Sequence, residues 1–412
     1  MKNSGLTWIG EIPTGWNIQR GKNILTLLER PIKDDDGVIT CFRDGEVTLR
    51  SKRREEGFTF SLQEIGYQGI EPGDLVVHGM DGFAGAIGIS DSRGKATPVL
   101  NVMDSTQSKR YLMYQLRTMA HCGLFFALSS GIRVRSCDTN WNKLRVISYV
   151  VPSLLEQQRI ADFLDVKCAE IDSILDATRT SVEEYKKLKQ SVITETVTKG
   201  ICGNRPMEET GVEWIGEIPA EWDVIKIKWL LKERNDRSEN GSEEPLSMSQ
   251  KYGIIPTNEL DTVPNMASSF VGAKLVSKGD LVFNKLKAHL GVFAVSEFDG
   301  LVSPDYAVYY SAGRCDVKYL ERIFKTPQYI SEFRKRSTGV GAGLTRLYTS
   351  DLFDMYTALP SETEQKEISA YLDDKCATID SLIASKEALI TELEAYKKSL
   401  IYEYVSGKKE VI

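Results

Sequence analysis

Clusters of lysine and arginine are the residues in this chain with the clearest potential for chemistry. Such cations neutralise phosphates, and an arginine or lysine can also bind a guanine edge through two hydrogen bonds. The clusters therefore predict DNA contacts, and the alternative is a solvated run of surface charge. The candidates are Arg43, Arg50, Lys52, Arg53, Arg54, Arg133 and Arg135 in the first half of the chain, and Lys285, Lys287, His289, Arg334, Lys335, Arg336 and Arg346 in the second.

The overall charge limits where DNA can bind. The chain has 412 residues and a formal net charge of −6, which taken alone disfavours a partner as acidic as DNA. Residues 1–151 nevertheless hold 19 basic and 16 acidic groups, a net of +3, whereas residues 207–360 hold 18 and 22, a net of −4. DNA binding is thus compatible with the first segment, and in the second it must depend on local patches or on a basic partner.

Several strings imitate catalytic or cofactor-binding motifs. Residues 303–306, Ser-Pro-Asp-Tyr, are similar to the motif with which amino-methylases hold a target base, but the second proline is missing. Residues 339–343 are glycine-rich but lack the βαβ frame and downstream acid of a dinucleotide site, which favours a loop near the DNA backbone. The phosphate-binding string GxxxxGK[ST] is absent, and His78, His121 and His289 are far apart. We expect no catalytic residue, no metal site and no cofactor bound by this chain.

The cysteines and apolar runs indicate the compartment. Seven cysteines are scattered without a CxxC pair, which favours reduced thiols over a disulfide framework or a zinc site. No apolar run reaches the roughly 18 residues that a bilayer requires, and residues 1–5 lack the apolar stretch of a secretory signal. We expect a cytoplasmic protein.

An internal repeat organises the chain. Residues 5–16 read GLTWIGEIPTGW and residues 211–222 read GVEWIGEIPAEW, an offset of 206. Residues 152–173 (PSLLEQQRIADFLDVKCAEIDS) recur as residues 360–381 (PSETEQKEISAYLDDKCATIDS), an offset of 208. Each half therefore has a constant head, a variable centre and a constant tail. The predicted segments are a first domain (1–151), a central helix (152–206), a second domain (207–359) and a C-terminal helix (360–412).

The constant tails predict two long helices. Ser153 and Ser361 are natural N-caps after a proline, and no proline or glycine interrupts residues 153–199 or 361–406. Apolar residues recur every seven residues, which is typical of a coiled coil. Because each helix occurs once per chain, we expect an antiparallel pair about 67 Å long. The predicted seam residues are Ile160, Leu164, Ile171, Ile174, Tyr185, Leu188, Ile368, Leu372, Ile379, Leu382, Leu393 and Tyr396.

Lysines interrupt this predicted seam at two equivalent positions, Lys167 and Lys375. A polar residue inside a seam can fix its register. The alternative is a lysine that extends its amine to solvent from a partly exposed seam.

The variable centres predict mixed α/β domains rich in strands. Short apolar runs bounded by turn residues indicate strands; the runs are 75–77, 86–89, 145–150, 281–283 and 292–295. Residues 109–128 and 316–336 indicate helices that cover the sheet. The expected fold class is α+β, with two similar mixed α/β domains joined by the two long helices in a pseudo-two-fold repeat.

The duplicated motifs resemble the conserved regions of type I restriction-modification specificity (S) subunits. The tail motif is an EQxxI helix opening that follows a proline, and the head motif is WIGEIPxxW. The resemblance covers the whole chain, including the order of two variable and two conserved regions. The residues that carry the tail motif are Glu156, Gln157, Ile160, Leu164 and Asp165, and Glu364, Gln365, Ile368, Leu372 and Asp373.

The resemblance implies a division of labour among subunits. Each variable centre would be a target recognition domain that reads one half of a bipartite, asymmetric DNA site. The paired helices would set the spacing between the half-sites and bind two methylase (modification) subunits, which motor-nuclease restriction subunits would join. S-adenosylmethionine would be bound by the methylase partner, and this chain would be a non-catalytic subunit.

Two other functions are compatible with parts of the sequence. One is an S-like structural adaptor, or a modulator of restriction without its own methylase. The other is a stand-alone DNA methyltransferase, which the missing cofactor loop and the incomplete catalytic motif disfavour.

Overall fold

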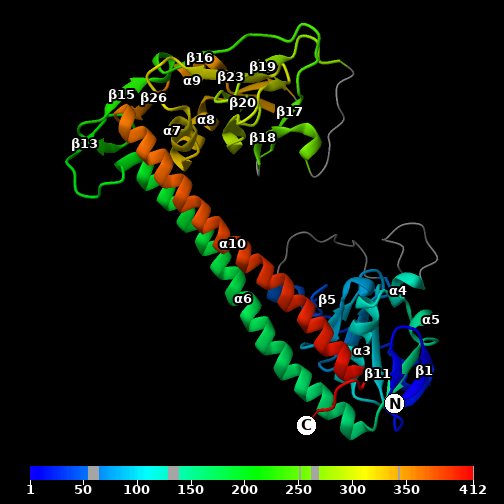
Figure 1. Cartoon of the computed structure of the whole chain (residues 1–412). Coiled ribbons are helices and arrows are strands. Elements are labelled where there is room, and N and C mark those ends of the chain that lie inside the picture. The colour runs from blue at the N-terminus through cyan, green and yellow to red at the C-terminus, as the bar shows by residue number, and fades with distance from the viewer. Residues whose placement is uncertain (54–64, 129–138, 250–251, 261–268, 342–343, 412) are drawn as a thin grey trace. The chain divides into compact units, whose positions relative to one another are not determined.

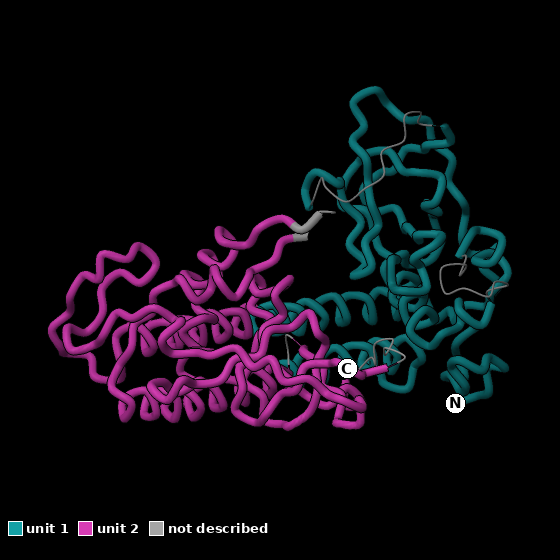
Figure 2. The backbone as a smooth tube through the Cα atoms, turned by 90° about the horizontal axis from the view of Figure 1, so that it is seen from above, with its two compact units in different colours: residues 1–179, 387–412 teal, residues 180–386 magenta. Residues whose placement is uncertain are grey.

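The computed structural model describes residues 1–53, 65–128, 139–249, 252–260, 269–341 and 344–411. It forms two compact units, which Figure 2 shows in separate colours. The first comprises Met1–Arg179 and Glu387–Ile412, and the second comprises Thr180–Lys386. Each unit contains its own sheets and one end of each long helix. The four sequence segments predicted above are a different division, and they stay a prediction.

The first unit is built on an antiparallel four-stranded sheet in the order β4-β11-β8-β9. These strands are β4 (Leu25–Leu27), β8 (Leu75–His78), β9 (Ile87–Ile89) and β11 (Leu100–Ser105). Strand pairs surround them: β1 (Lys2–Leu6) with β2 (Gly10–Ile12), β3 (Asn17–Arg20) with β12 (Ser148–Val151), β5 (Ile39–Cys41) with β6 (Val47–Leu49), and β7 (Gln68–Ile70) with β10 (Gly94–Ala96). The helices are α1 (Gly21–Ile24), α2 (Arg50–Arg53), α3 (Lys109–His121), α4 (Leu124–Ala127) and α5 (Trp141–Leu144), with a 3₁₀ turn η1 (Gly82–Ala84).

The second unit has a four-stranded sheet of the matching order, β16-β23-β20-β21. These strands are β16 (Leu231–Glu233), β20 (Leu281–Asn284), β21 (Phe293–Val295) and β23 (Tyr306–Ser311). Strand pairs are β13 (Met207–Glu209) with β14 (Glu217–Pro219), β15 (Asp223–Lys226) with β26 (Tyr356–Leu359), β17 (Leu246–Ser249) with β18 (Gly253–Pro256), β19 (Lys274–Val276) with β22 (Gly300–Val302), and β24 (Thr338–Gly341) with β25 (Leu344–Arg346). The helices are α7 (Val317–Phe324), α8 (Pro327–Arg336) and α9 (Thr349–Phe353), with 3₁₀ turns η3 (Ile227–Trp229), η4 (Thr257–Glu259) and η5 (Ala288–Leu290).

The central strand of each main sheet is buried on both faces. Leu75 and Val77 of β8 belong to the core that contains α3, whereas Val76 packs with the small strand pairs on the opposite face. In β20, Leu281 and Phe283 pack with α7 and α8, and Val282 faces the other way. Burial on two sides explains why these strands read as continuous apolar runs. The prediction of mixed helix and strand is confirmed.

Three element boundaries differ from the sequence prediction. The helix expected over residues 109–128 ends at His121, and Gly123 adopts a left-handed φ of 73° before α4 begins. The helix expected over 316–336 divides at Thr326, because Pro327 starts α8 as its first helical residue. The strand expected over 145–150 begins only at Ser148.

The two constant tails form α6 (Leu154–Lys199) and α10 (Glu362–Val405), which lie side by side (Figure 1). In the first unit Asp172 accepts a hydrogen bond from Lys397 at 2.6 Å, and Arg179 donates to Glu394 at 2.7 Å. In the second unit Lys189 donates to Asp380 at 2.6 Å, and the Lys386 amine lies 5.6 Å from the Tyr185 ring centroid. Residue numbers rise along one helix as they fall along the other, so the helices are antiparallel within each unit.

Burial along these helices corrects part of the predicted seam. Burial recurs in steps of four and three, and the α6 positions are Leu164, Cys168, Ile171, Leu175, Thr178 and Val182. Predicted seam residues Ile160, Ile368, Leu372 and Ile379 are buried as well, and Tyr185 and Leu393 are half-buried. The prediction is wrong for four residues that are 41–56% exposed, namely Ile174, Leu188, Leu382 and Tyr396.

The error has a simple geometric cause. The predicted series through Leu164 and Ile171 is buried. The second buried series runs through Cys168 and Leu175, whereas the prediction placed it one residue earlier, at Lys167 and Ile174. The side chain of Lys167 is 43% exposed and pairs with Glu170 at 2.8 Å, so it lies beside the seam and not in it. No helix in the described part of the chain is long and apolar enough to cross a membrane.

Candidate nucleic-acid interface

The constant residues attach the first sheet to α6. The Trp16 indole Nε1 donates a hydrogen bond to Glu156 Oε1 at 2.9 Å, which joins the head motif to the tail motif. The adjacent Gln157 accepts from the backbone N–H of Ser108 at 3.0 Å and donates to the Pro152 carbonyl at 3.0 Å. The head, the start of α3 and the end of β12 are therefore held by two consecutive side chains.

The second unit repeats these contacts. Trp222 Nε1 donates to Glu364 Oε2 at 2.9 Å, and Gln365 accepts from the backbone N–H of Asp316 at 2.7 Å while donating to the Pro360 carbonyl at 2.9 Å. The partners keep the repeat offsets of 206 and 208. The EQ pair of the tail thus has a structural role that is the same in both halves.

A buried tyrosine in each unit contacts the C-terminal end of a long helix, α10 in the first unit and α6 in the second. Tyr111 Oη donates to the carbonyls of Val150 and Val405 at 3.3 and 3.2 Å. Tyr319 Oη contacts the carbonyls of Ala358 and Val197 at 3.3 and 3.2 Å. Burial raises the pKa of both phenols well above the ordinary value, so they remain donors. Each domain is therefore fixed to the start of one long helix and the end of the other.

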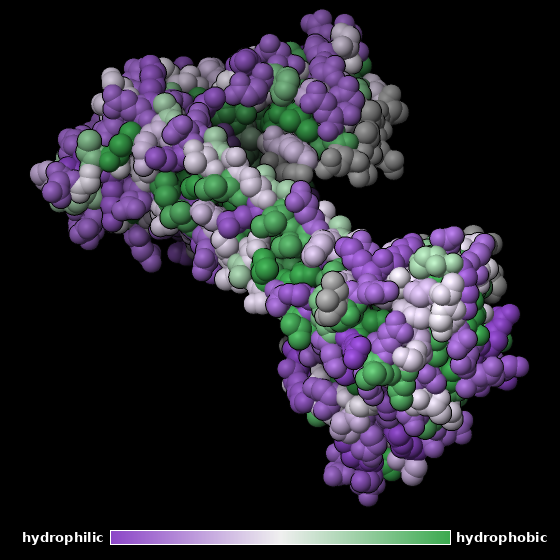
Figure 3. Space-filling view, turned by 60° about the horizontal axis from the view of Figure 1, so that its bottom comes forward, coloured by the Kyte–Doolittle hydropathy of each residue, from purple (hydrophilic) through white to green (hydrophobic). Residues whose placement is uncertain are grey.

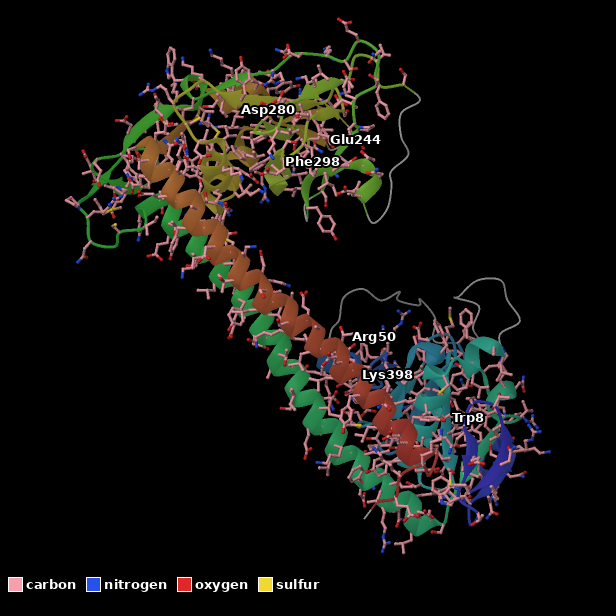
Figure 4. The ribbon with its side chains drawn as sticks, in the orientation of Figure 1. Trp8, Arg50, Glu244, Asp280, Phe298 and Lys398 are labelled. Carbon is pink, nitrogen blue, oxygen red and sulfur yellow. The ribbon has the colours of Figure 1, made fainter. Side chains whose placement is uncertain are left out.

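Three predicted DNA contacts meet in the first unit. Arg43, Arg50 and Arg53 line a hollow of about 800 Å³, together with His78 and Asp81. We call it the reading hollow, and Figure 4 labels Arg50, one of its lining residues. The hollow is open to solvent and large enough for a base edge or a phosphate, both of which suit arginine.

Ion pairs orient two of these arginines, Arg53 and Arg43. Arg53 pairs with Asp44 and with Glu46 at 3.0 Å, and its guanidinium lies 4.1 Å from the Phe42 ring centroid. Arg43 pairs with Asp81 at 2.8 Å. These carboxylates fix the positions of the two guanidinium groups that line the reading hollow.

His78 is a residue of this hollow that the sequence did not single out as a contact. Its Nδ1 accepts hydrogen bonds from the backbone N–H groups of Met80 and Asp81 at 3.2 and 3.0 Å. Burial lowers its pKa, and the positive charge of Arg43 lowers it further, against the opposing effect of Asp81. A neutral His78 therefore fixes the turn at Met80 and Asp81, and Asp81 is the ion-pair partner of Arg43.

The other predicted contacts of the first unit lie elsewhere. Lys52 donates to Asp91 and Ser92 at 3.1 and 2.7 Å, outside the residues that line the reading hollow. Arg54, Arg133 and Arg135 lie outside the described residues.

In the second unit Lys285 and Arg346 come together. The backbone N–H of Leu347 donates to the Lys285 carbonyl at 3.0 Å, which joins the end of β25 to the end of β20. Arg346 pairs with Asp305 at 3.2 Å. Burial lowers the pKa of Lys285, and the charges of Lys274 and Arg346 lower it further. An anion beside this amine would relieve that electrostatic cost.

The remaining candidates of the second unit form another group. Lys287 is the N-cap of η5 and His289 lies within this turn. The turn packs against α8, the helix that ends in Arg334, Lys335 and Arg336. Lys335 and Arg336 pair with the buried Glu332 at 3.5 and 2.8 Å, and Arg336 lies 5.2 Å from the Trp214 ring centroid. Arg334 and Lys287 are exposed.

A second hollow occupies the matching place in the second unit. It measures about 250 Å³, and its lining includes Ser247, Thr257, Ser303 and Tyr306. Thr257 occupies the position that Arg50 has in the first unit. The backbone N–H of Arg50 donates to the carbonyl of Val38, just before β5, and the backbone N–H of Thr257 donates to the carbonyl of Pro245, just before β17. The first hollow is basic and the second is hydroxyl-bearing and apolar. The sequence did not predict this hollow, although the offset of 207 between those contacts could have located it.

The described residues contain no group of three or more histidine, cysteine or acidic side chains that could hold a metal ion. The described cysteines form no disulfide. Burial raises the pKa of Cys41, in the reading hollow, to about 12, which leaves it protonated and unreactive.

Comparisons with known proteins point to one family. No family model matches the chain. Two Methanocaldococcus jannaschii proteins named as type I restriction enzyme specificity subunits, MjaX and MjaVIII, are each 22% identical over 243 and 252 residues. These matches cover 55% and 58% of this chain, and the chain spans just over half the length of the relatives, 55% and 57%. The EcoKI specificity subunit of Escherichia coli is 20% identical over 411 residues, which cover 90% of this chain and 84% of that protein.

Solved structures show the same fold. A chain from a type I restriction-modification system, solved to explain its assembly and conformational transition, superposes with a TM-score of 0.71 at 13% identity, covering 97% of this chain and 100% of that one. The HsdS subunit from Thermoanaerobacter tengcongensis superposes with a TM-score of 0.52 at 14% identity, covering 99% and 100%. The predicted resemblance to type I specificity subunits is confirmed, because the curated relatives carry that name and the fold is that of HsdS.

Proposed function

We propose that this relative of type I specificity subunits is the DNA-sequence-specificity subunit of a type I restriction-modification complex, with each unit reading one half of a bipartite site. The observation that carries the proposal is the duplicated attachment of each domain to the long helices, through Trp16 and Glu156 and again through Trp222 and Glu364. A duplicated scaffold of this kind presents two reading surfaces to one duplex.

The two half-sites differ in sequence. The attachment contacts are the same in both units, whereas the hollows differ: arginines in the first, and Ser247, Thr257 and Tyr306 in the second. Side chains with different donors and acceptors read different base edges. The target is therefore asymmetric.

The helices set the spacing between the half-sites as an antiparallel coiled coil with pseudo-two-fold symmetry. Burial at alternating steps of four and three supports this pairing. The ion pairs support the symmetry. Under the offset of 208 Asp172 corresponds to Asp380 and Lys189 to Lys397, so the pair Asp172–Lys397 corresponds to the pair Asp380–Lys189. At about 1.5 Å per residue, the 46 residues of α6 extend roughly 69 Å.

Two methylase subunits dock on the same helices. Both helices expose apolar side chains, as the green surface along them in Figure 3 shows. We call this set the outer stripe, and it consists of Ile174, Leu188, Leu382, Leu389 and Tyr396, each at least 41% exposed. Ile174 and Leu382, and likewise Leu188 and Tyr396, are equivalent under the offset of 208, so the stripe offers two similar sites.

This chain contributes no catalytic group. S-adenosylmethionine is bound by the methylase, motor-nuclease restriction subunits join through the methylase complex, and the assembly works on DNA in the cytoplasm. The motif at residues 303–306 lacks the second proline of the amino-methylase motif, and its Pro304 and Tyr306 line the second hollow.

The experiment is methylation mapping across the genome with and without this chain. Deletion should remove adenine methylation from one bipartite, asymmetric motif. Exchange of residues 17–151 for the first centre of another specificity subunit should change one half of that motif and keep the other. Methylation of DNA by the purified chain alone would contradict the proposal.

A further inference from the structure

A second basic hollow lies in the first unit, between the end of α3 and the long helices. It measures about 300 Å³ and is lined by α3 through Arg117 and His121, by α6 through Asp172 and Arg179, and by α10 through Glu394, Lys397 and Lys398. We call it the junction hollow. It shares the lining residues Arg43 and Asp44 with the reading hollow, so the two hollows are adjacent.

The junction hollow has an excess of positive charge. Five cations line it, at Arg43, Arg117, Arg179, Lys397 and Lys398, against three acids, at Asp44, Asp172 and Glu394, a net of +2. Two of the acids are matched within the hollow, since Asp172 pairs with Lys397 and Glu394 pairs with Arg179. Asp44 is matched by Arg53, and Arg43 by Asp81, both from outside the junction hollow.

Lys398 contributes charge that no described acid matches within ion-pair distance. It is exposed, and Figure 4 labels it on α10 at the first unit. The pKa of the neighbouring His121 is lowered by partial burial and further by the charges of Lys398, Arg117 and Lys397. The electrostatic potential at this histidine is therefore positive. A cation that repels its neighbours in this way gains from an anionic partner.

The second unit lacks this chemistry at the equivalent positions. The residues 208 positions on from Arg117 and His121 are Lys325 and Tyr329, and Lys398 corresponds to Gln190. Lys325 pairs with Glu321, and Tyr329 is buried at 2% exposure. The attachment contacts of the two units are equivalent, so the scaffold does not require the positive charge of the junction hollow.

We propose that the junction hollow binds the phosphate backbone of DNA next to the half-site that the first unit reads, and contributes affinity without reading sequence. The inference rests on the proposed function. DNA is the occupant that fits because the hollow is cationic, solvent-accessible and adjacent to the reading hollow, with which it shares Arg43. Backbone contacts fix the position of a reading surface on the duplex and carry no sequence information themselves.

The test compares Lys398→Gln with Lys366→Gln. Lys366 is an exposed lysine on the same helix, outside the junction hollow, and it pairs with Glu362. The full chain is assembled with its methylase, and its affinity for a duplex with the mapped motif is measured at several salt concentrations. Loss of one phosphate contact should make the slope of log K against log salt shallower by about 0.9 for Lys398→Gln alone. The methylated motif should stay unchanged.

Three results would overturn the inference. An unchanged salt slope for Lys398→Gln means that the hollow does not hold phosphate. A changed methylation motif means that Lys398 reads bases. Weaker methylase assembly with an unchanged salt slope means that a protein covers the hollow. Failure of the proposed function is distinct, because the unmodified complex would then show no bipartite motif.

Discussion

The indole of Trp16 and the carboxylate of Glu156 share a 2.9 Å hydrogen bond across 140 positions of the chain, and Trp222 and Glu364 share one of the same length across 142. In the second unit Arg205 adds to this contact. Its Nη1 donates to Glu364 Oε1 at 2.6 Å, and its guanidinium lies 5.9 Å from the Trp222 ring centroid. Glu364 therefore accepts from two donors that are largely shielded from water.

Replacing Glu364 by alanine should destabilise the second unit. The change leaves the Trp222 indole and the Arg205 guanidinium, 18% exposed, without their shared acceptor. Hydrogen bonds to charged groups contribute about 1.5–3 kcal/mol, so the free energy of unfolding should fall by about that amount. Urea unfolding followed by circular dichroism measures it.

The control for Glu364→Ala is Glu362→Ala on the same helix turn. Glu362 is 64% exposed and pairs with Lys366, four residues on, which predicts a loss of about 0.3–0.5 kcal/mol. Equal losses for the two variants would show that the tryptophan contact contributes nothing beyond a surface ion pair.

His78 should make the first unit sensitive to acid. Because its pKa is lowered in the folded state, the unfolded chain binds the proton more readily. The stabilising effect is complete above the ordinary pKa of 6.5 and is lost as the pH falls through the lowered folded value. Protonation at Nδ1 also removes the acceptor for the N–H groups of Met80 and Asp81.

The matched variant is His78→Asn, which copies the second unit. There Asn284 holds the equivalent turn by accepting from the Leu286 backbone N–H at 3.1 Å. Thermal unfolding between pH 7.5 and 5 should show a smaller loss for the variant than for the unmodified chain. His121 is present in both proteins, so its own titration cancels. Parallel profiles would rule out His78 as the acid-sensitive group.

Lys285 should trade stability for DNA affinity. Burial and the nearby charges of Lys274 and Arg346 disfavour its charged form. Lys285→Gln should therefore leave the melting temperature unchanged or raise it, while the salt slope of DNA binding becomes shallower by about 0.9. Thermal unfolding and salt-dependent binding measure the two effects. A lower melting temperature with an unchanged slope would assign Lys285 to the fold instead.

The sequence predicted the features that repeat. The head motif WIGEIPxxW and the EQ pair recur because the same two contacts, tryptophan to glutamate and glutamine to a backbone N–H, attach each domain to its helix. The strands at 75–77 and 281–283 were predictable because burial on both faces requires an apolar run.

The sequence could not separate the two apolar surfaces of the long helices. Leu175 and Ile174 are neighbours of similar hydrophobicity, and one is 4% exposed while the other is 49% exposed. A heptad pattern shows that both surfaces are apolar but not which one the chain itself covers.

The sequence also could not show which basic residues form ion pairs in the folded chain. Arg336 and Arg53 read as free surface cations, yet Arg336 binds Glu332 and Arg53 binds Asp44. The field at Lys398 depends on α3, which lies nearly 280 residues earlier in the chain. Only the fold brings these charges together.

The outer stripe should be required for methylase assembly and not for folding. Ile174 and Leu382 are equivalent under the offset of 208 and are 49% and 41% exposed. Replacing both by glutamate adds charge to solvent-facing positions, so the free energy of unfolding of the isolated chain should change by less than about 0.5 kcal/mol at each site. The same charges would be desolvated beneath a docked methylase, and assembly should be lost.

Co-purification and the mass of the complex in light scattering measure that assembly. The matched control replaces Ile171 and Ile379, which are 6% and 8% exposed on the buried side of the same helices, by glutamate. Those changes should unfold the helix pair, because a buried unpaired charge costs several kcal/mol. If the Ile174 and Leu382 variant binds methylase as well as the unmodified chain does, the outer stripe is not the docking surface, whatever the control shows.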